Sequence, residues 1–219
     1  MKERFYGEKS LNSDKKLIIF DMDGTLVNSS ITIANAINYV RHNLGFEPMD
    51  ETHILRLVND HTINPAQTFY HAEAFESDHE KWFSEYYTKN HENELVLYEG
   101  IKEMLEILKG KGHTLAVATN AYRISTLESL THLNVDHLFD AIACYDDVPQ
   151  GKPHPDMLHK ILDELEHAPH EALFIGDGPR DEVASQRAEI DYIMVDWGFT
   201  DHDDAVRTVE ALEKMLLGV

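Results

Sequence analysis

Five short apolar runs, separated by segments with helical periodicity, constrain the fold of this chain more than any other feature. The runs span residues 17–20, 115–118, 141–144, 172–175 and 192–195, and each is too short to be a helix. Residues that share a helical face follow the second, third and fourth runs: Ile124, Leu127, Leu130 and Leu133; then Leu158, Ile161, Leu162 and Leu165; then Val183, Ala184 and Arg187. Alternating strands and helices are typical of a parallel sheet, so we expect an α/β fold with a Rossmann-like core.

The interval 27–97 breaks this alternation, because it reads as helix throughout and offers no strand to pair with the first run. Ser29 or Ser30 can cap its first helix, and Gly45 ends that helix. The apolar face of the helix carries Ile33, Ile37, Val40 and Leu44. Further helical stretches lie around residues 53–58 and 65–89. We therefore predict a Rossmann-like core of residues 1–27 and 98–219, with an inserted all-helical domain of residues 28–97.

The chain is strongly acidic. Its 219 residues include 40 Asp and Glu against 19 Lys and Arg, which gives a net charge of −21. Such a surface repels polyanions and argues against nucleic acid as a partner. It also repels a small phosphorylated molecule at long range. Any phosphate site must therefore be built from a local cluster of cations and amide donors.

One cysteine and a polar N-terminal stretch bear on the compartment. Cys144 cannot form an internal disulfide, and its place in an apolar run predicts a buried thiol. Residues 1–16 contain no apolar stretch, so we expect neither a signal peptide nor a membrane span there. The 14 histidines lack tight metal-ligand spacing, and we expect them on the surface. A cytoplasmic protein without membrane contact is the expectation.

Polar residues that suit phosphoryl transfer follow the predicted strands. Parallel strands end at one edge of a sheet, and ligands bind in the crevice at that edge. In chain order these residues are Asp21, Asp23, Thr119, Asn120, Lys152, Asp177 and Asp181. The set contains a carboxylate nucleophile, a second carboxylate two residues on, a hydroxyl, a cation and further carboxylates for a metal. Phosphoryl transfer uses such groups, because cations must neutralise the negative charge of its transition state.

The string Asp-Met-Asp-Gly-Thr at residues 21–25, directly after Leu-Ile-Ile-Phe, resembles the first motif of the haloacid dehalogenase superfamily. The other motifs of that family follow in order: Thr119 at a strand end, Lys152 before Pro153, and Gly-Asp-Gly-Pro-Arg-Asp at residues 176–181. The resemblance covers nearly the whole chain. The helical insert, residues 145–156 and the pair Trp197-Gly198 are similar to the group that includes phosphoglycolate phosphatases, whose small helical cap closes over the site.

The resemblance implies a phosphatase that acts on a small phosphorylated metabolite. Asp21 would attack phosphorus to form an aspartyl phosphate, which divides one difficult step into two. Asp23 would be the general acid for the leaving oxygen and then the base for the hydrolytic water. Thr119 and the amide of Asn120 would hold phosphoryl oxygens.

The resemblance also implies a magnesium site. Mg²⁺ would sit between an oxygen of Asp21, the backbone carbonyl of Asp23 and the carboxylate of Asp177. Lys152 would stabilise the nucleophile and the incoming charge. Asp181 would anchor Lys152 or a metal-bound water.

Simpler interpretations compete at single positions. An Asp-x-Asp-Gly string alone is often a turn, Lys152 could be a solvated loop cation, and an acidic residue such as Asp181 is stabilised in the first turn of a helix whatever its function. The joint placement of the four motifs favours the phosphatase. A nucleotide or sugar phosphate phosphatase, a catalytically idle binding protein of the same fold and a metal-dependent phosphotransferase remain as alternatives.

Substrate selection would lie in the helical insert. Residues 59–62 lack the glycine expected in the substrate-facing loop of phosphoglycolate phosphatases. Asn59 and His61 are candidate substrate contacts, with surface positions equally open. Arg56 and Arg123 could pair with a second anionic group, although an exposed helix face is the commoner place for either. The physiological substrate and the oligomeric state stay open.

Overall fold

The computed structural model describes residues 15–58, 62–198 and 204–218, and within them lies a sheet of five parallel strands. The central strand β1 (Leu17–Phe20) pairs with β4 (Thr114–Ala118) on one side and β6 (Ala172–Gly176) on the other. The edge strands are β5 (Ala141–Ala143) and β7 (Asp191–Met194). The prediction of a parallel α/β sheet is confirmed, and the strand bounds differ from the predicted ones by one residue at most.

Helices cover both faces of the sheet. Ile18 and Phe20 of β1 belong to a core formed with α5 (Ile101–Gly110), α6 (Arg123–His132) and α9 (Val209–Leu217). Leu17 and Ile19 belong to a second core with α7 (Asp156–Glu164) and α8 (Pro179–Ala188). A strand that is buried on both faces has no polar side, which explains the continuous apolar sequence of β1.

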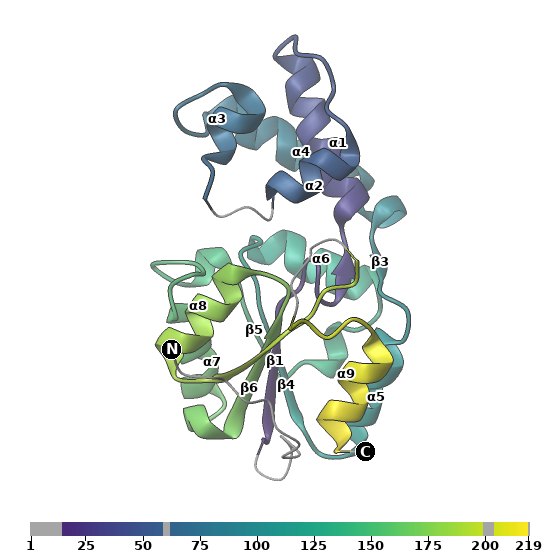
Figure 1. Cartoon of the computed structure of the whole chain (residues 1–219), viewed down its shortest axis with the longest axis vertical. Helices are drawn as coiled ribbons and strands as arrows, with labels where there is room; N and C mark the ends of the chain where they lie inside the picture. Colours follow the sequence, from purple (N-terminus) through teal and green to yellow (C-terminus); the bar gives the residue numbers. More distant parts are fainter. Residues whose placement is uncertain (1–14, 59–61, 199–203, 219) are drawn as a thin grey trace.

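Four helices form a separate layer above the sheet in Figure 1: α1 (Ser30–Asn43), α2 (Glu51–Val58), α3 (Pro65–Tyr70) and α4 (Ser77–Glu94). They share their own apolar cluster, which includes Ile37, Ile54 and Phe69. The buried Arg41 ties α1 to α3, because its Nη1 donates to the carbonyl of Phe69 at 2.6 Å. The insert therefore has a hydrophobic core distinct from the two that flank the sheet.

One predicted helical stretch of the insert, residues 65–89, is wrong as a single element. The chain leaves α3 at His71, whose backbone is left-handed with φ of 57°, and begins a new helix at Ser77. Such a conformation ends a helix and is uncommon for a residue other than glycine. Nothing in the apolar periodicity marks this break.

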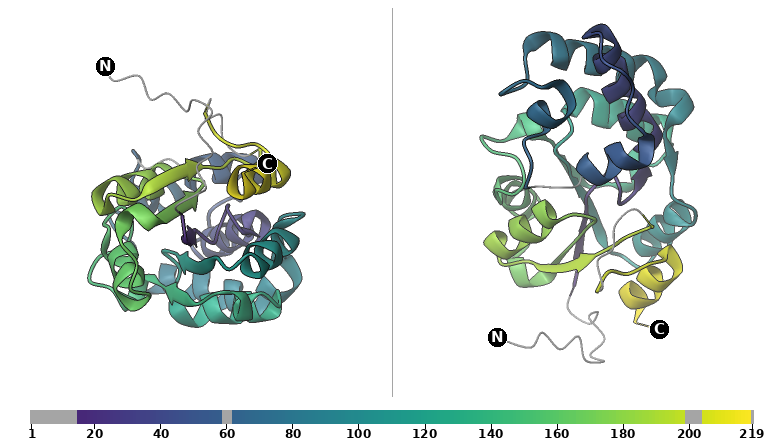
Figure 2. Two further views of the ribbon diagram at one scale, coloured as in Figure 1. Left: turned by 90° about the horizontal axis from the view of Figure 1, so that it is seen from below. Right: turned by 45° about the horizontal axis from the view of Figure 1, so that its top comes forward.

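The chain enters and leaves the helical layer through two adjacent short strands. β2 (Val27–Asn28) and β3 (Val96–Leu97) pair antiparallel, with Val27 opposite Leu97 and Asn28 opposite Val96. The expectation that this interval is helical throughout is therefore wrong at its two ends. Two-residue strands are too short to show an alternating pattern. Figure 2, on the right, shows the helices of the insert above the strands of the sheet.

The predicted apolar face of α6 is wrong for Ile124 and Leu127, whereas Leu130 and Leu133 do pack against the core. Ile124 is 73% exposed and Leu127 is 38% exposed, whereas Thr126, Ser129 and Leu130 are buried. The helix is rotated so that the buried stripe runs through two small polar residues and one leucine. Helical spacing allows several stripes, and the packing partners decide which one is buried.

Three further expectations can be compared with the described residues. Cys144 is buried and free, as predicted. His79 is buried against the ring of Tyr70, so the expectation of surface positions fails for this histidine. In the part of the chain that the structure describes, no helix has the length and apolarity to cross a membrane.

Candidate active site

The site is built around the turn that follows β1. The N–H of Asp21 still donates to Ile175 of β6 at 2.8 Å, and the chain then folds back, with the N–H groups of Leu26 and Val27 both donating to the carbonyl of Met22 at 2.9 Å. This turn carries Gly24 at φ of +82°, where a Cβ would lie 2.1 Å from an oxygen of Asp177. Only glycine fits both the backbone and this close approach.

A buried cation joins two of the predicted site residues. Nζ of Lys152 lies 2.5 Å from Oδ1 of Asp21 and 2.6 Å from Oδ1 of Asp181, and all three side chains are buried. The ammonium group also lies over the ring of Phe174 at 5.5 Å. Buried charges are tolerated when they are paired and hydrogen-bonded. The structure thus brings Asp21, Lys152 and Asp181 together although 160 positions separate the first from the last.

The carboxylates of the site outnumber this cation, and the pKa values of three of them are raised. Burial raises the pKa of Asp21 to about 7, while Lys152 partly offsets the rise and Asp181 adds to it. Burial likewise raises the pKa values of Asp23 and Asp177. Burial alone would lower the pKa of Lys152, but Asp181 and Asp21 outweigh it and raise that pKa. The single positive charge of Lys152 is therefore too small to offset the carboxylates of the site.

The donor set fits a divalent cation. Asp21, Asp177 and Asp181 each offer a carboxylate oxygen, and these three atoms lie within 4.8 Å of one another. Among the described residues, Oδ1 of Asp23 is buried without a hydrogen-bond partner. Anionic oxygen ligands are those that hard cations such as Mg²⁺ prefer. A divalent cation at this position would supply the charge that Lys152 alone does not.

Thr119 and Asn120 follow β4, the neighbour of β1. Thr119 is buried, and its hydroxyl oxygen accepts the N–H of Ala121 at 3.1 Å. Nδ2 of Asn120 donates to the carbonyl of Lys152 at 2.9 Å, and its Oδ1 accepts the N–H of Lys152 at 2.8 Å. The side chain of Asn120 therefore holds the loop that carries the buried cation.

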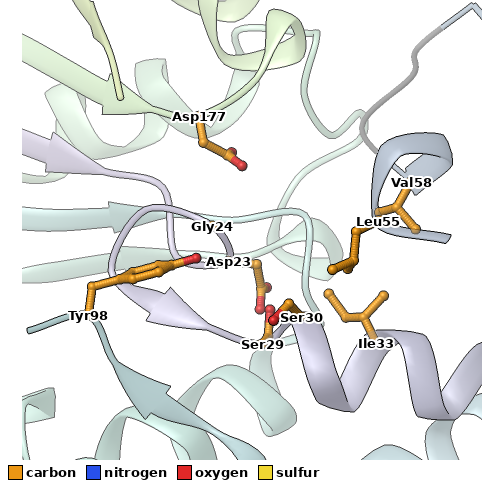
Figure 3. Close-up of a pocket in the computed structure, with 9 residues that line it drawn as sticks. All are labelled: Asp23, Gly24, Ser29, Ser30, Ile33, Leu55, Val58, Tyr98 and Asp177. Carbon is orange, nitrogen blue, oxygen red and sulfur yellow. The ribbon is translucent and has the colours of Figure 1, made fainter. Parts of the chain in front are cut away.

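A pocket lies between this edge of the sheet and the helical insert (Figure 3). It is lined by Asp23, Gly24, Asp177, Tyr98, Ser29, Ser30, Ile33, Leu55 and Val58. The hydroxyl of Ser29 hydrogen-bonds the carboxyl of Asp23, which lowers the raised pKa of that group. The pocket thus joins the predicted acidic residues to side chains of α1 and α2.

Two hydrogen bonds beside the site were not predicted from the sequence. The hydroxyl of Tyr192 donates to the carbonyl of Gly176 at 2.9 Å, and the indole N–H of Trp197 donates to the carbonyl of Thr25 at 2.9 Å. Both support loops that carry site carboxylates. Trp197 was noted in the sequence only as part of the pair Trp197-Gly198. It comes three residues after β7, where the strand-end rule also points.

The candidate substrate contacts in the insert have mixed outcomes. Asn59 and His61 lie outside the described residues. Arg56 is exposed. Arg123 is engaged away from the pocket, because its Nε lies 2.6 Å from Oδ1 of Asp147 and its Nη2 donates to the carbonyl of Ile142 at 2.6 Å. Arg123 is therefore a structural residue of the β5 edge.

Comparison with known proteins gives the class to which this fold and site belong. The family model of haloacid dehalogenase-like hydrolases matches residues 18–195, and the chain belongs to that family. The phosphoglycolate phosphatase of Haemophilus influenzae is 31% identical over 199 residues, 86% of this chain and 89% of the relative. The pyrophosphatase PpaX of Bacillus cereus is 30% identical over 183 residues, 82% of each chain.

A solved structure agrees with these relatives. The crystal structure of a predicted phosphoglycolate phosphatase from Haemophilus somnus has a TM-score of 0.74 and 30% identity, over 84% of this chain and 86% of that one. Within the family, this protein is a phosphatase.

Proposed function

We propose that the protein hydrolyses a small phosphomonoester in a magnesium-dependent reaction, through an aspartyl phosphate on Asp21. The buried charge network of Asp21, Lys152 and Asp181 beside Asp177 carries this proposal. Lys152 holds the nucleophilic carboxylate in one orientation and offsets part of its charge. A nucleophile held in place costs less entropy when it attacks.

In the first half-reaction a carboxylate oxygen of Asp21 forms a bond to phosphorus and the bond to the leaving oxygen breaks. Asp23, which lines the pocket, gives a proton to the departing alcohol. In the second half-reaction a water molecule attacks the phosphorus of the aspartyl phosphate. Asp23 takes a proton from this water, and phosphate leaves with Asp21 regenerated.

The remaining predicted residues stabilise the phosphoryl group. Thr119 and the backbone amide of Asn120 would donate hydrogen bonds to its oxygens. Mg²⁺, held by Asp21, the carbonyl of Asp23 and Asp177, would neutralise negative charge on the transferring group. Asp181 anchors Lys152 through the 2.6 Å ion pair.

We propose further that residues 28–97 are a cap that closes over this site and selects the substrate. The separate apolar cluster of the insert and its two adjacent connections support this assignment. Relatives named for phosphoglycolate and for pyrophosphate support a small phosphorylated metabolite as the substrate. A nucleotide or sugar phosphate is the alternative. The single free cysteine, Cys144, is compatible with the cytoplasm.

The test is phosphate release from a panel of small phosphomonoesters with Mg²⁺, run beside Asp21→Asn and Asp23→Asn. The first variant should lose all activity. The second should release phosphate at a rate reduced about 10²- to 10⁴-fold, the usual contribution of general acid–base catalysis. Acid-quenched wild type should carry a phosphoryl group that mass spectrometry locates on Asp21. A folded wild type that hydrolyses nothing would support a binding protein of this fold instead.

A further inference from the structure

The wall of the pocket that faces the acidic residues is aliphatic. Ile33 of α1 and Leu55 and Val58 of α2 lie together on one side of the pocket in Figure 3, and the side chain of Leu55 is directed toward Asp23. All three are partly buried, and Ile33 and Val58 also pack against the apolar cluster of the insert. The same pocket contains Asp23, the proposed proton donor to the leaving group, so the leaving group of a substrate would meet this wall.

No cationic side chain is among the described residues that line the pocket. Its lining contains two carboxylates, Asp23 and Asp177, together with hydroxyl and aliphatic groups. Arg56 follows Leu55 on α2 but is exposed and outside the lining. Lys152 is already paired with Asp21 and Asp181.

An anionic leaving group would be unfavourable in this setting. Its charge would lose water against the aliphatic wall, and none of the described residues that line the pocket offers a cation to compensate it. An uncharged alcohol with some apolar surface avoids this penalty and gains contact with Ile33, Leu55 and Val58.

We infer that the physiological substrate is the phosphate ester of an uncharged alcohol, and that Leu55 helps to exclude esters whose leaving group carries a negative charge. This inference rests on the proposed phosphatase function and deepens it. It favours a sugar-like or otherwise neutral alcohol over glycolate.

The test uses two esters of equal size, phosphoglycolate and its amide, glycolamide phosphate, which differ only in the charge of the leaving group. Wild type should show at least tenfold higher kcat/KM for the amide. Leu55→Lys should shift the ratio of the two kcat/KM values at least tenfold toward phosphoglycolate, because it places a cation at the wall. Comparing this ratio between variant and wild type cancels the intrinsic reactivity of the esters.

Two controls separate local charge from other effects. Leu55→Met keeps an uncharged chain at the wall and should leave the ratio within twofold of wild type. Glu51→Lys changes the charge on an exposed position of the same helix and should also leave the ratio within twofold. Circular dichroism and thermal melting confirm that each variant is folded.

The outcomes separate the substrate class, the role of Leu55 and the proposed phosphatase function. Wild type that prefers phosphoglycolate, or treats the two esters alike, overturns the inference and leaves the phosphatase intact. A folded Leu55→Lys variant with an unchanged ratio removes the role of Leu55. If wild type releases phosphate neither from these esters nor from p-nitrophenyl phosphate, the proposed function fails and the inference fails with it. If Leu55→Lys does not fold, the wild-type ratio still decides the substrate class.

Discussion

The side chain of Asn120 makes two hydrogen bonds to the backbone of Lys152. Its Nδ2 donates to the carbonyl of Lys152 at 2.9 Å, and its Oδ1 accepts the N–H of Lys152 at 2.8 Å. The two residues are 32 positions apart in the chain. Lys152 in turn holds Asp21. The side chain of Asn120 is thus a positioning group for the buried cation, a role separate from that proposed for its backbone amide.

Asn120→Ala should lower kcat about tenfold to a hundredfold with a smaller change in KM, because small displacements of a catalytic group have effects of that size. The matched control is Asn64→Ala in the insert. The side chain of Asn64 also makes two hydrogen bonds to backbone, to Glu73 and from Gln67. That variant should lose about 1 kcal/mol of unfolding free energy, as for an N-cap, and keep its kcat. Equal kcat values for the two variants would contradict the positioning role.

Gly24→Ala should abolish phosphate release and weaken Mg²⁺ binding. The new Cβ would lie 2.1 Å from an oxygen of Asp177, far inside van der Waals contact, so Asp177 or the turn must move. Gly112→Ala is the control, because Gly112 has φ of +88° but nothing within 4 Å of an added Cβ. Both variants carry the same backbone strain, of about 1–2 kcal/mol. Activity and metal titration should separate them, and similar loss in both would refute a specific clash at Asp177.

Leu130→Ala should cost about 2–5 kcal/mol of unfolding free energy, because the side chain is fully buried in the sheet core. Ile124→Ala, on the same helix, should change it by less than about 0.5 kcal/mol, because Ile124 is exposed. Urea unfolding of both variants measures the difference. A large loss at Ile124 would mean that a partner or a second copy covers this face.

Cys144 should resist thiol reagents in the folded protein. Burial raises the pKa of its thiol, so less of the reactive thiolate forms at a given pH than in the unfolded chain. At pH 8 the reaction with a disulfide reagent should be slow in buffer and rapid in urea, where the thiol regains a pKa of about 8.5. Equal rates in the two conditions would show that the thiol is accessible.

The strands, and the edge of the sheet at which the site lies, were predictable for one physical reason. A strand buried on both faces must be apolar throughout, as β1 is, and parallel strands all end at the same edge. Asp21, Thr119 and Asp177 therefore had to be neighbours. Lys152 was predicted at the same edge because it follows the third predicted strand after a short loop, and the ion pair with Asp21 agrees with that placement.

Helix rotation and short elements could not be predicted. Sequence spacing shows that α6 has a periodic pattern, but only its neighbours decide that Thr126 and Leu130 face inward. The wall formed by Ile33, Leu55 and Val58 depends on how α1 and α2 are turned toward the sheet. The break at His71 needs a left-handed residue that no local pattern announces.

The pairing of β2 with β3 makes the insert modular. Because Val27 lies opposite Leu97, the two positions where the insert joins the core are adjacent. A short turn could connect these two positions without disturbing the sheet. Whole inserts could thus be exchanged between phosphatases at this pair of residues. Substrate preference would then be transferred together with the insert, while Asp21, Lys152 and the residues around them stay unchanged.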